Sequence, residues 1–325
     1  PWCLHLSYIK PHWPYIAPAP YNSMYGPPDV VPVVRSEEER RDPHPVYAQF
    51  MELRVSRTFA KPGVREEVVP VYMGLVKQID DQLGRLFAFM EQRGLIDNTL
   101  IVFTSDHGDY LGDHWLGEKD LFHEPSVKVP LIVCDPSPEA DGARGTTCDA
   151  LVEAIDLVPT FIDAVGGDAG GQSHRLEGRS LLPLLRGERP ARWRRYAVSE
   201  YDYALMPVAE KLGRQPSEAR LFMVADARWK LVHAPGFRPM LFDLETDPNE
   251  LRDLGADPAY EGERQRLSAA LHAWGLRQSQ RTTLSDQQIR DRRGKSQRRG
   301  ILIGVWDEGE LPDELWSRYL GYDGA

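Results

Sequence analysis

The chain has 325 residues, of which 42% are hydrophobic and 27% are charged, as is usual for a globular protein. Its length suffices for one large domain or for a large and a small one, and its net charge of -10 disfavours nucleic acid and anionic membranes as partners. No apolar run reaches the roughly 20 residues that a membrane span requires. The cysteines have no metal-site or CxxC spacing, which favours reduced thiols and a cytoplasmic location: Cys3, Cys134 and Cys148.

The chain begins with an alternating apolar segment, Cys3 to Tyr8, that predicts a strand. A proline-rich segment, Lys10 to Tyr21, follows, and its four prolines exclude a helix and favour a stiff, extended loop. His12 lies in this loop, directly after the expected strand. A histidine held in this way is suited to act as a fixed general acid or anion ligand, and an ordinary surface histidine is the alternative.

The next two segments differ sharply in pattern. Residues Asn22 to Arg65 are rich in proline and charge, which predicts an irregular lid or binding loop with one short helix near Tyr47 to Arg54. Residues Glu66 to Gln92 repeat apolar side chains at helical spacing and predict a long helix closed by Gly94. The helix leads into an expected buried strand, Leu100 to Phe103, and together they make an αβ unit of a parallel or mixed sheet.

The strand is followed at once by a polar group, Asp106, His107 and Gly108. An aspartate supplies a hard oxygen and a neutral histidine supplies a nitrogen to a divalent cation, and ligands of open parallel sheets bind at the carboxyl ends of strands. Both side chains can reach one ion if the chain turns there, which Gly108 permits. The pattern alone leaves open a metal pair or a polar strand end that leads into a solvated loop.

The rest of the chain predicts a few shorter elements. Val127 to Val133 is expected to be a buried strand with Pro130 at an edge or bulge, and Asp156 to Val165 is expected to be a helix. A change in composition at Gly187 to Arg195 marks a boundary. Beyond it, Tyr260 to Gln280 predicts a closing helix, preceded by four short strands of a small antiparallel sheet: Tyr196 to Tyr201, Arg220 to Ala225, Trp229 to His233 and Met240 to Asp243.

These elements predict an α/β fold in three parts. Residues 1–190 would hold a mixed, largely parallel central sheet flanked by helices, and residues 191–280 a small α+β subdomain with an antiparallel sheet and one packing helix. Residues 281–325 form a charged tail with apolar clusters. We expect this tail to wrap another subunit of a homo-oligomer, with a partly ordered terminus as the alternative.

Four segments, in this order, carry a resemblance to a known family. They are LSYIKPHWPY; the long helix running into GLIDNTLIVFTSDHGDYLGDHWLGEKDLFHEPSVKVPLIV; AIDLVPTFIDAVGG followed by LEGRSLLPLLRG; and WKLVHAPGFRPMLFDLETDPNELRDL. Together they resemble the sulfatase family of the alkaline phosphatase superfamily, and within it the phosphonate monoester hydrolase and phosphodiesterase branch. The resemblance covers most of residues 1–255 and implies an alkaline phosphatase-like fold that hydrolyses small anionic sulfate, phosphonate or phosphate esters.

The resemblance implies roles for four positions. Asp106 and His107 match the motif that holds one divalent metal ion, calcium or manganese. Lys119 matches the lysine that contacts the sulfuryl or phosphoryl oxygens, and His12 matches the histidine that contacts the substrate and protonates the leaving group. A tetrahedral oxyanion needs such positive charge as its own charge redistributes. Asp109 is open between a further metal ligand and a partner of a ligand, whereas two neighbours are expected to brace the loop: Asp113 and His114.

One part of the family pattern is missing from this sequence. Family members carry a nucleophilic cysteine or serine in a C/S-x-P-x-R motif, oxidised to formylglycine, and an upstream pair of acidic metal ligands. None of the three cysteines lies in such a motif. We therefore expect the nucleophile to lie upstream of Pro1 and this chain to be inactive alone. Two alternatives stay open: a two-metal phosphodiesterase or phosphomutase of the superfamily, and a non-catalytic protein that keeps the fold.

Overall fold

The computed structural model describes residues 2–277 and residue 288, and the chain divides into two compact units. The second unit comprises Gly170–Glu177 and Gln278–Ala325, and its described part holds one 3-10 turn, Gly170–Gln172. The first unit, Pro1–Ala169 and Gly178–Arg277, holds every feature discussed below. Except for residue 288, the expected oligomer arm at 281–325 lies outside the described residues, and the division at residue 190 stays a prediction.

The helices of the first unit are mostly short, with one long exception. The predicted long helix is confirmed, and α3 spans Val64–Gln92. No helix in the described part of the chain is long and apolar enough to cross a membrane. The other helices are α1 (Pro45–Met51), α2 (Arg54–Phe59), α4 (Glu124–Val127), α5 (Leu157–Ala164), α6 (Leu182–Leu185), α7 (Pro207–Lys211) and α8 (Glu261–Gly275).

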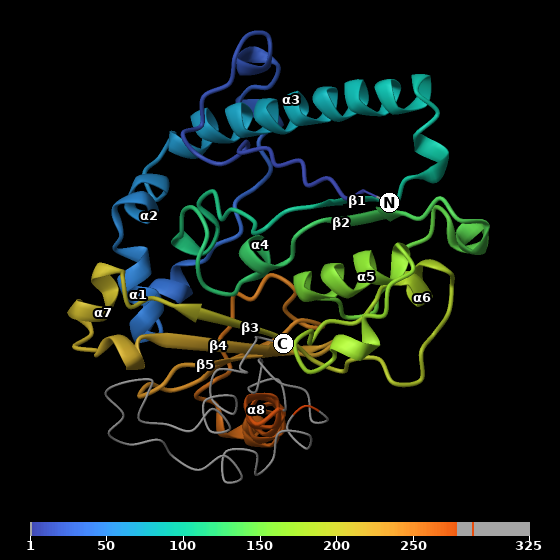
Figure 1. Cartoon of the computed structure of the whole chain (residues 1–325). Coiled ribbons are helices and arrows are strands. Elements are labelled where there is room, and N and C mark those ends of the chain that lie inside the picture. The colour runs from blue at the N-terminus through green and yellow to red at the C-terminus, as the bar shows by residue number, and fades with distance from the viewer. Residues whose placement is uncertain (1, 278–287, 289–325) are drawn as a thin grey trace, which may run out of the picture. The chain divides into compact units, whose positions relative to one another are not determined.

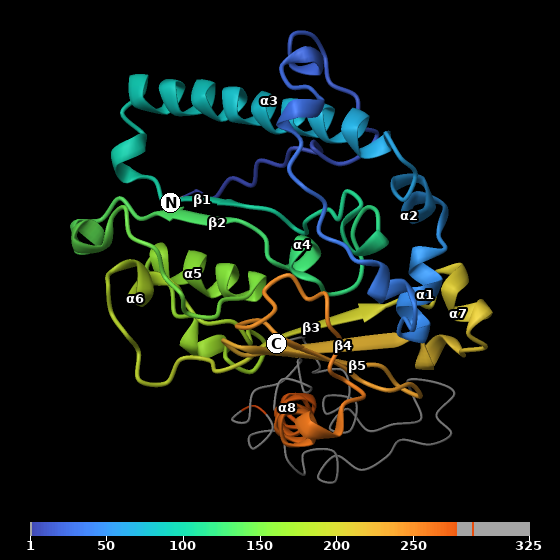
Figure 2. The same cartoon turned by 180° about the vertical axis from the view of Figure 1, so that it is seen from behind.

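The strand that precedes the polar group pairs with the next strand along the chain. β1 (Ile101–Thr104) and β2 (Leu131–Cys134) form a two-stranded antiparallel sheet in which Ile101 pairs with Cys134. Figures 1 and 2 show α3 along one side of this pair and α5 on the other. This pair is an antiparallel part of the expected mixed sheet, because the chain returns from β1 and lies beside it in the opposite direction. The strands are also only half-buried, and Ile132 is 64% exposed.

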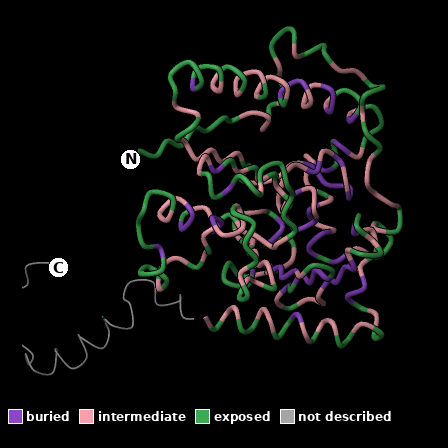
Figure 3. Tube along the Cα trace, turned by 90° about the vertical axis from the view of Figure 1, so that its right-hand side faces the viewer, coloured by how far each residue is buried: buried purple, intermediate pink, exposed green. Residues whose placement is uncertain are grey.

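The amino-terminal segment does not form the strand that its alternation predicts. No strand is assigned to Cys3–Tyr8, and its side chains are exposed. In Figure 3 the trace at the N-terminus has the colour of exposed residues. A strand exists only where its backbone groups bond to a neighbour, and no described segment pairs with this one. The alternation of apolar side chains indicated β-structure, but it carried no information about a pairing partner.

The predicted antiparallel sheet is confirmed. Its order is β3-β4-β5-β6, with every neighbouring pair antiparallel, as a meander of short strands requires. Its strands are β3 (Ala197–Asp202), β4 (Arg220–Ala225), β5 (Trp229–His233) and β6 (Met240–Asp243). The closing helix α8 packs on β4 and β5 through Leu267, which contacts a cluster that includes Leu231 and Leu241.

The opposite face of the same sheet receives the loop between β1 and β2. Leu116, Leu121 and Phe122 of that loop are buried in a second apolar cluster, together with Val232 and Phe242 of the sheet. Burying such side chains removes several hundred square ångströms of apolar surface from water. Each square ångström contributes about 25 cal/mol of stabilisation. The polar residues that follow β1 are thus carried by a loop with a hydrophobic anchor and not by a solvated loop.

Candidate active site

The residues Ser105–Asp120, here called the metal loop, begin directly after β1. Asp106 is exposed, and its Oδ2 lies 3.5 Å from Nε2 of His107. The other ring nitrogen of His107 lies 2.8 Å from the carbonyl oxygen of Gly108. Because a carbonyl only accepts, Nδ1 carries the proton and Nε2 keeps its free lone pair. One oxygen and one nitrogen therefore face each other at a separation that a single divalent ion can bridge.

The turn at Gly108 leaves no space for a side chain, so only glycine fits there. A Cβ atom at this position would lie 1.9 Å from the carbonyl oxygen of Pro125, far inside van der Waals contact. The amide nitrogen of Gly108 donates a hydrogen bond to the carbonyl oxygen of Ser126 (2.8 Å). The start of α4 thus packs directly on the backbone beside Asp106 and His107.

The proline-rich segment Lys10–Tyr21, here called the His12 loop, meets the metal loop at two side chains. Nζ of Lys119 lies 3.1 Å from Nε2 of His12, although the two residues are 107 positions apart. Nδ1 of His12 lies 2.8 Å from the carbonyl oxygen of Trp13, so this nitrogen donates and Nε2 accepts from the lysine. The rings of His12 and His107 lie 6.2 Å apart. The structure therefore brings together all four residues that the sequence singled out.

The stretch from Leu111 to Leu121, at the end of the metal loop and just beyond it, has an unusual backbone. Six of its residues that are not glycine have positive φ angles between 46° and 85°: Leu111, His114, Trp115, Glu118, Asp120 and Leu121. Such conformations cost free energy and persist where the surroundings fix them. Trp115 and Leu116 are buried, and the amide of Tyr110 donates a hydrogen bond to the backbone carbonyl oxygen of Glu118 (2.7 Å). Lys119 is thus presented from a loop whose shape is held by packing.

Two residues that the sequence placed in a bracing role do contact neighbouring segments. Oδ1 of Asp113 accepts from the amide of Val34 (2.9 Å), and Nδ1 of His114 lies 2.7 Å from Oε1 of Glu39. The ring of His114 stacks on His123 at 3.8 Å. These contacts join the metal loop to the long irregular segment that precedes α3.

Sequence reasoning missed Tyr15. Its hydroxyl donates to Oδ2 of Asp109 (2.7 Å), while Oδ1 of Asp109 accepts from the amide of Leu111 (3.1 Å). Burial raises the pKa of Asp109, and burial together with that carboxylate raises the pKa of Tyr15. A tyrosine between Pro14 and Ile16 gives no sign of this partner, because Asp109 lies 94 positions away.

Acidic side chains flank Lys119 on both sides. Burial raises the pKa of Glu118 and of Asp120, and the hydroxyl of Tyr201 hydrogen-bonds to Asp120. The ammonium of Lys119 therefore has a carboxyl group of the metal loop on each side of it in the sequence. The local field is therefore mixed, and the positive charge is concentrated at the ammonium itself.

The donor atoms present fit part of a metal site. Asp106 and His107 supply an oxygen and a nitrogen, the types that a manganese-like divalent ion accepts. Within residues 2–277 and 288, no group of three or more His, Cys, Asp or Glu side chains could hold an ion. By themselves these two side chains would supply only part of a coordination set.

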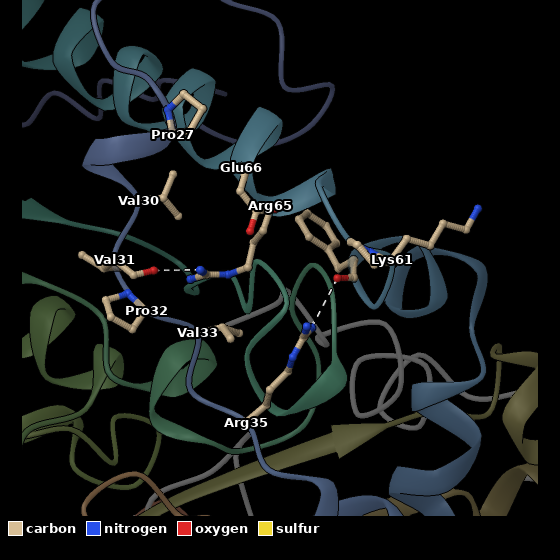
Figure 4. A pocket seen from close by; sticks show the side chains of 11 residues that line it. Pro27, Val30, Val31, Pro32, Val33, Arg35, Lys61, Arg65 and Glu66 are labelled. Carbon is tan, nitrogen blue, oxygen red and sulfur yellow. Dashed lines mark hydrogen bonds between the residues drawn. The ribbon is translucent and has the colours of Figure 1, made fainter.

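A separate cavity of about 200 Å³ lies beside the long irregular segment and contains none of the four residues above. Figure 4 shows that its guanidinium groups reach backbone carbonyls: Arg65 donates to Val31 (2.8 Å), and Arg35 lies 3.4 Å from the oxygen of Phe59. Arg65 also donates to Leu111 (2.9 Å). These arginines tie the irregular segment to α2, α3 and the metal loop, which is a structural role.

Two family models match the chain. The sulfatase model matches residues 1–167, and the model for the C-terminal part of N-sulphoglucosamine sulphohydrolase matches residues 112–276. The multifunctional alkaline phosphatase superfamily protein PehA of Trinickia caryophylli is 32% identical over 87% of this chain and 57% of its own length. The choline-sulfatase of Rhizobium meliloti is 31% identical over 79% of this chain and 47% of its own. The chain thus spans about half the length of these relatives.

Solved structures agree with these matches. The phosphonate monoester hydrolase of Silicibacter pomeroyi aligns with a TM-score of 0.78 at 33% identity, covering 87% of this chain and 58% of that one. The phosphonate monoester hydrolase of Agrobacterium radiobacter aligns with a TM-score of 0.77 at 32% identity, covering 86% and 57%. The predicted alkaline phosphatase-like α/β fold is confirmed by these neighbours together with the small antiparallel sheet.

Proposed function

The chain belongs to the sulfatase family, and from this premise we propose that it carries the C-terminal part of the active site of a metal-dependent hydrolase of sulfate, phosphonate or phosphate esters. The observation that carries the proposal is the meeting of His12 and Lys119 at 3.1 Å, with the ring of His107 6.2 Å from that of His12. An oxyanion placed there would face an ammonium, an imidazole and the metal pair, which is the arrangement that stabilises charge in acyl, sulfuryl and phosphoryl transfer.

Each residue has a chemical task in this proposal. Asp106 and His107 would hold one divalent ion, calcium or manganese, which supplies Lewis-acid charge to the oxyanion when bound. Lys119 would turn its ammonium from His12 to a sulfuryl or phosphoryl oxygen of the substrate. His12 would then take up a second proton from solvent at Nε2 and donate it to the leaving oxygen, while its Nδ1–H stays on the carbonyl of Trp13.

The nucleophile is proposed to come from a segment upstream of Pro1. The three cysteines are exposed and free, and none stands in a C/S-x-P-x-R sequence. The matches cover only 57% and 47% of the two relatives, and several apolar side chains that face solvent here would suit a further layer, among them Leu4 and Ile132. On this proposal the upstream segment brings a formylglycine and the remaining acidic ligands, and the chain alone is inactive.

The test uses the extended protein, meaning this chain preceded by its upstream C/S-x-P-x-R segment. Asp106→Ala should abolish metal-dependent turnover of an aryl sulfate and of a phosphonate monoester, because the ion loses one of its two ligands from this chain. Asp80→Ala is the matched control, since Asp80 is an exposed aspartate paired with Lys77 on the surface of α3. Full turnover by Asp106→Ala would overturn the assignment.

A second candidate is a two-metal phosphodiesterase or phosphomutase of the alkaline phosphatase superfamily, to which PehA also belongs by name. It requires more ligands than one aspartate and one histidine. Elemental analysis of the extended protein separates the two, with one divalent ion per active site on the first proposal and two on the second. The substrate on either proposal is a small anionic ester, and the cytoplasmic location and the oligomer stay predictions.

A further inference from the structure

We infer that Tyr15 and Asp109 form a positioning pair that holds the His12 loop against the metal loop while the site works. The inference rests on the function proposed above, because the two loops carry the proposed catalytic groups. It concerns neither a metal ligand nor a group that touches the substrate. The pair is a fixed tie between two segments that are distant in sequence.

In the described residues, two side-chain hydrogen bonds join these loops. One is the contact of Lys119 with His12 (3.1 Å), and the other is the bond from Tyr15 to Asp109 (2.7 Å). In the proposed reaction the first contact is broken, because Lys119 turns to a sulfuryl or phosphoryl oxygen of the substrate. The second contact uses groups without a role in the chemistry, so it persists when the first is broken. It is therefore the tie that can keep His12 in place during turnover.

The ring of Tyr15 is held in place independently of its hydroxyl. It packs edge to face against Phe59 of α2 at 6.2 Å and against Tyr72 of α3 at 6.3 Å. Two aromatic neighbours from different helices restrict the ring in two directions. The hydroxyl is thus aimed at the metal loop before it bonds there, which reduces the entropy that the bond must offset.

The carboxylate of Asp109 is occupied on both sides. Oδ2 accepts from Tyr15, and Oδ1 accepts from the amide of Leu111 (3.1 Å), two residues further along the metal loop. Each oxygen of Asp109 thus already has a partner from the chain itself. The geometry therefore favours a carboxylate that fastens Tyr15 to the backbone of the metal loop, directly beside the metal pair.

The first experiment uses the chain itself and needs no activity. Ring signals of His12 and His107 are recorded by NMR in the wild type, in Tyr15→Phe and in Tyr21→Phe. Tyr21 is a matched control, because its hydroxyl donates to Oδ2 of Asp81 (2.9 Å) from the same loop, but to α3. We expect the His12 signal to shift and broaden in Tyr15→Phe and to stay unchanged in Tyr21→Phe. Equal effects in the two variants would overturn the inference.

Substitutions of Asp109 separate a tie from a metal ligand. In Asp109→Asn the amide oxygen can still accept from Leu111, and the amide nitrogen can donate to the hydroxyl oxygen of Tyr15. We expect this variant to keep the wild-type His12 signal and Asp109→Ala to behave like Tyr15→Phe. If Asn disturbed the signal as much as Ala, the positioning role would be refuted.

The second experiment uses the extended protein. Tyr15→Phe should lower kcat on the order of tenfold and change KM less than about twofold, since a displaced proton donor slows the chemical step more than it weakens binding. Tyr21→Phe should leave both unchanged, and an unchanged kcat in Tyr15→Phe would contradict the inference. If the wild-type extended protein hydrolysed no ester, the proposed function would fail, and the NMR comparison would still decide on the pair.

Discussion

Gly108, beside the metal pair, is a position where one added carbon atom should lower the stability of the fold. In Gly108→Ala, the new Cβ would sit 1.9 Å from the oxygen of Pro125, so α4 and the metal loop must move apart. We expect a loss of unfolding free energy of about 1–3 kcal/mol and a displaced His107. Gly84→Ala is the control, because Gly84 lies inside α3 with open space around its Cβ, and alanine there should stabilise by about 0.5–1 kcal/mol. Chemical denaturation of both variants checks this, and equal stability would contradict the close contact.

His44 couples stability to pH. Burial lowers the pKa of this histidine to about 4 in the folded chain, against an ordinary 6.5, and its Nδ1 accepts from the amide of Val46 at the start of α1. The neutral ring is thus favoured by folding. The stability it provides is present above pH 6.5 and is lost as the pH falls towards 4, by about 2–3 kcal/mol at pH 4.5.

Asn at position 44 can accept the same amide without titrating. We therefore expect the unfolding free energy of His44→Asn to depend less on pH between 6.5 and 4.5 than that of the wild type, as measured by denaturation at several pH values. If the unfolding free energies of the two proteins changed equally with pH, His44 would not be the source of the pH dependence.

At the residue scale, the candidate site was predictable where its residues lie together in sequence. The predicted strand is followed directly by the polar residues Asp106 and His107 and by Gly108, and Lys119 follows in the same loop. Tyr15 was not predictable, since its significance depends on Asp109, 94 positions away. The positive φ angles of the metal loop were equally hidden, because side chains such as Trp115 and Leu121 give no sign of a left-handed backbone.

At the scale of elements, a largely buried ion cluster fastens the segment that follows the metal loop to the antiparallel sheet. Nζ of Lys230 in β5 lies 2.7 Å from carboxylate oxygens of both Glu124 and Glu250, and it donates to the carbonyl of Phe122 (3.0 Å). Burial raises the pKa of Glu250. Burial also acts to raise the pKa of Glu124, but Lys230 outweighs it and holds that pKa below its ordinary range.

Lys230→Met should therefore destabilise the chain by about 3–5 kcal/mol, because the buried carboxylate of Glu250 and the half-buried carboxylate of Glu124 lose their cation. The matched control is Lys77→Met, which removes a lysine that is also paired with two acids, Asp80 and Asp81, but on the exposed surface of α3. We expect little change there, since solvent screens such pairs. Thermal unfolding measures both, and similar losses in the two variants would contradict a buried role for the cluster.

Elements were predictable where the pattern is local. The period of apolar residues located α3, and alternating runs with turns between them located the four strands β3 to β6. Strand pairing is not local. The direction of β2 relative to β1 depends on a connection whose path the sequence does not give, and the segment Cys3–Tyr8 alternates like a strand yet has no partner in the described residues.

At the scale of the whole molecule, apolar side chains that ordinarily lie in a core face solvent. Trp2, Leu4, Leu6 and Ile9 are between 48% and 79% exposed, and so is Ile132 of β2 at 64%. A surface of this kind marks an interface. On the proposed account, the upstream segment covers it.

The chain alone should therefore bind a hydrophobic fluorescent dye strongly, and the extended protein should bind it weakly. Limited proteolysis of the first nine residues provides a second measurement, with cleavage expected in the chain alone and protection expected in the extended protein. Equal dye binding and equal cleavage in the two proteins would show that the upstream segment packs elsewhere.

The most direct test of the account is the rate of ester hydrolysis by the extended protein before and after removal of divalent metal. Aryl sulfate and phosphonate monoester are supplied in turn, the metal is removed with a chelator, and calcium or manganese is then restored. The account predicts hydrolysis of at least one ester, its loss on chelation and its return with one ion per active site. Hydrolysis that persists without metal, or that is equally fast in Asp106→Ala, would contradict it.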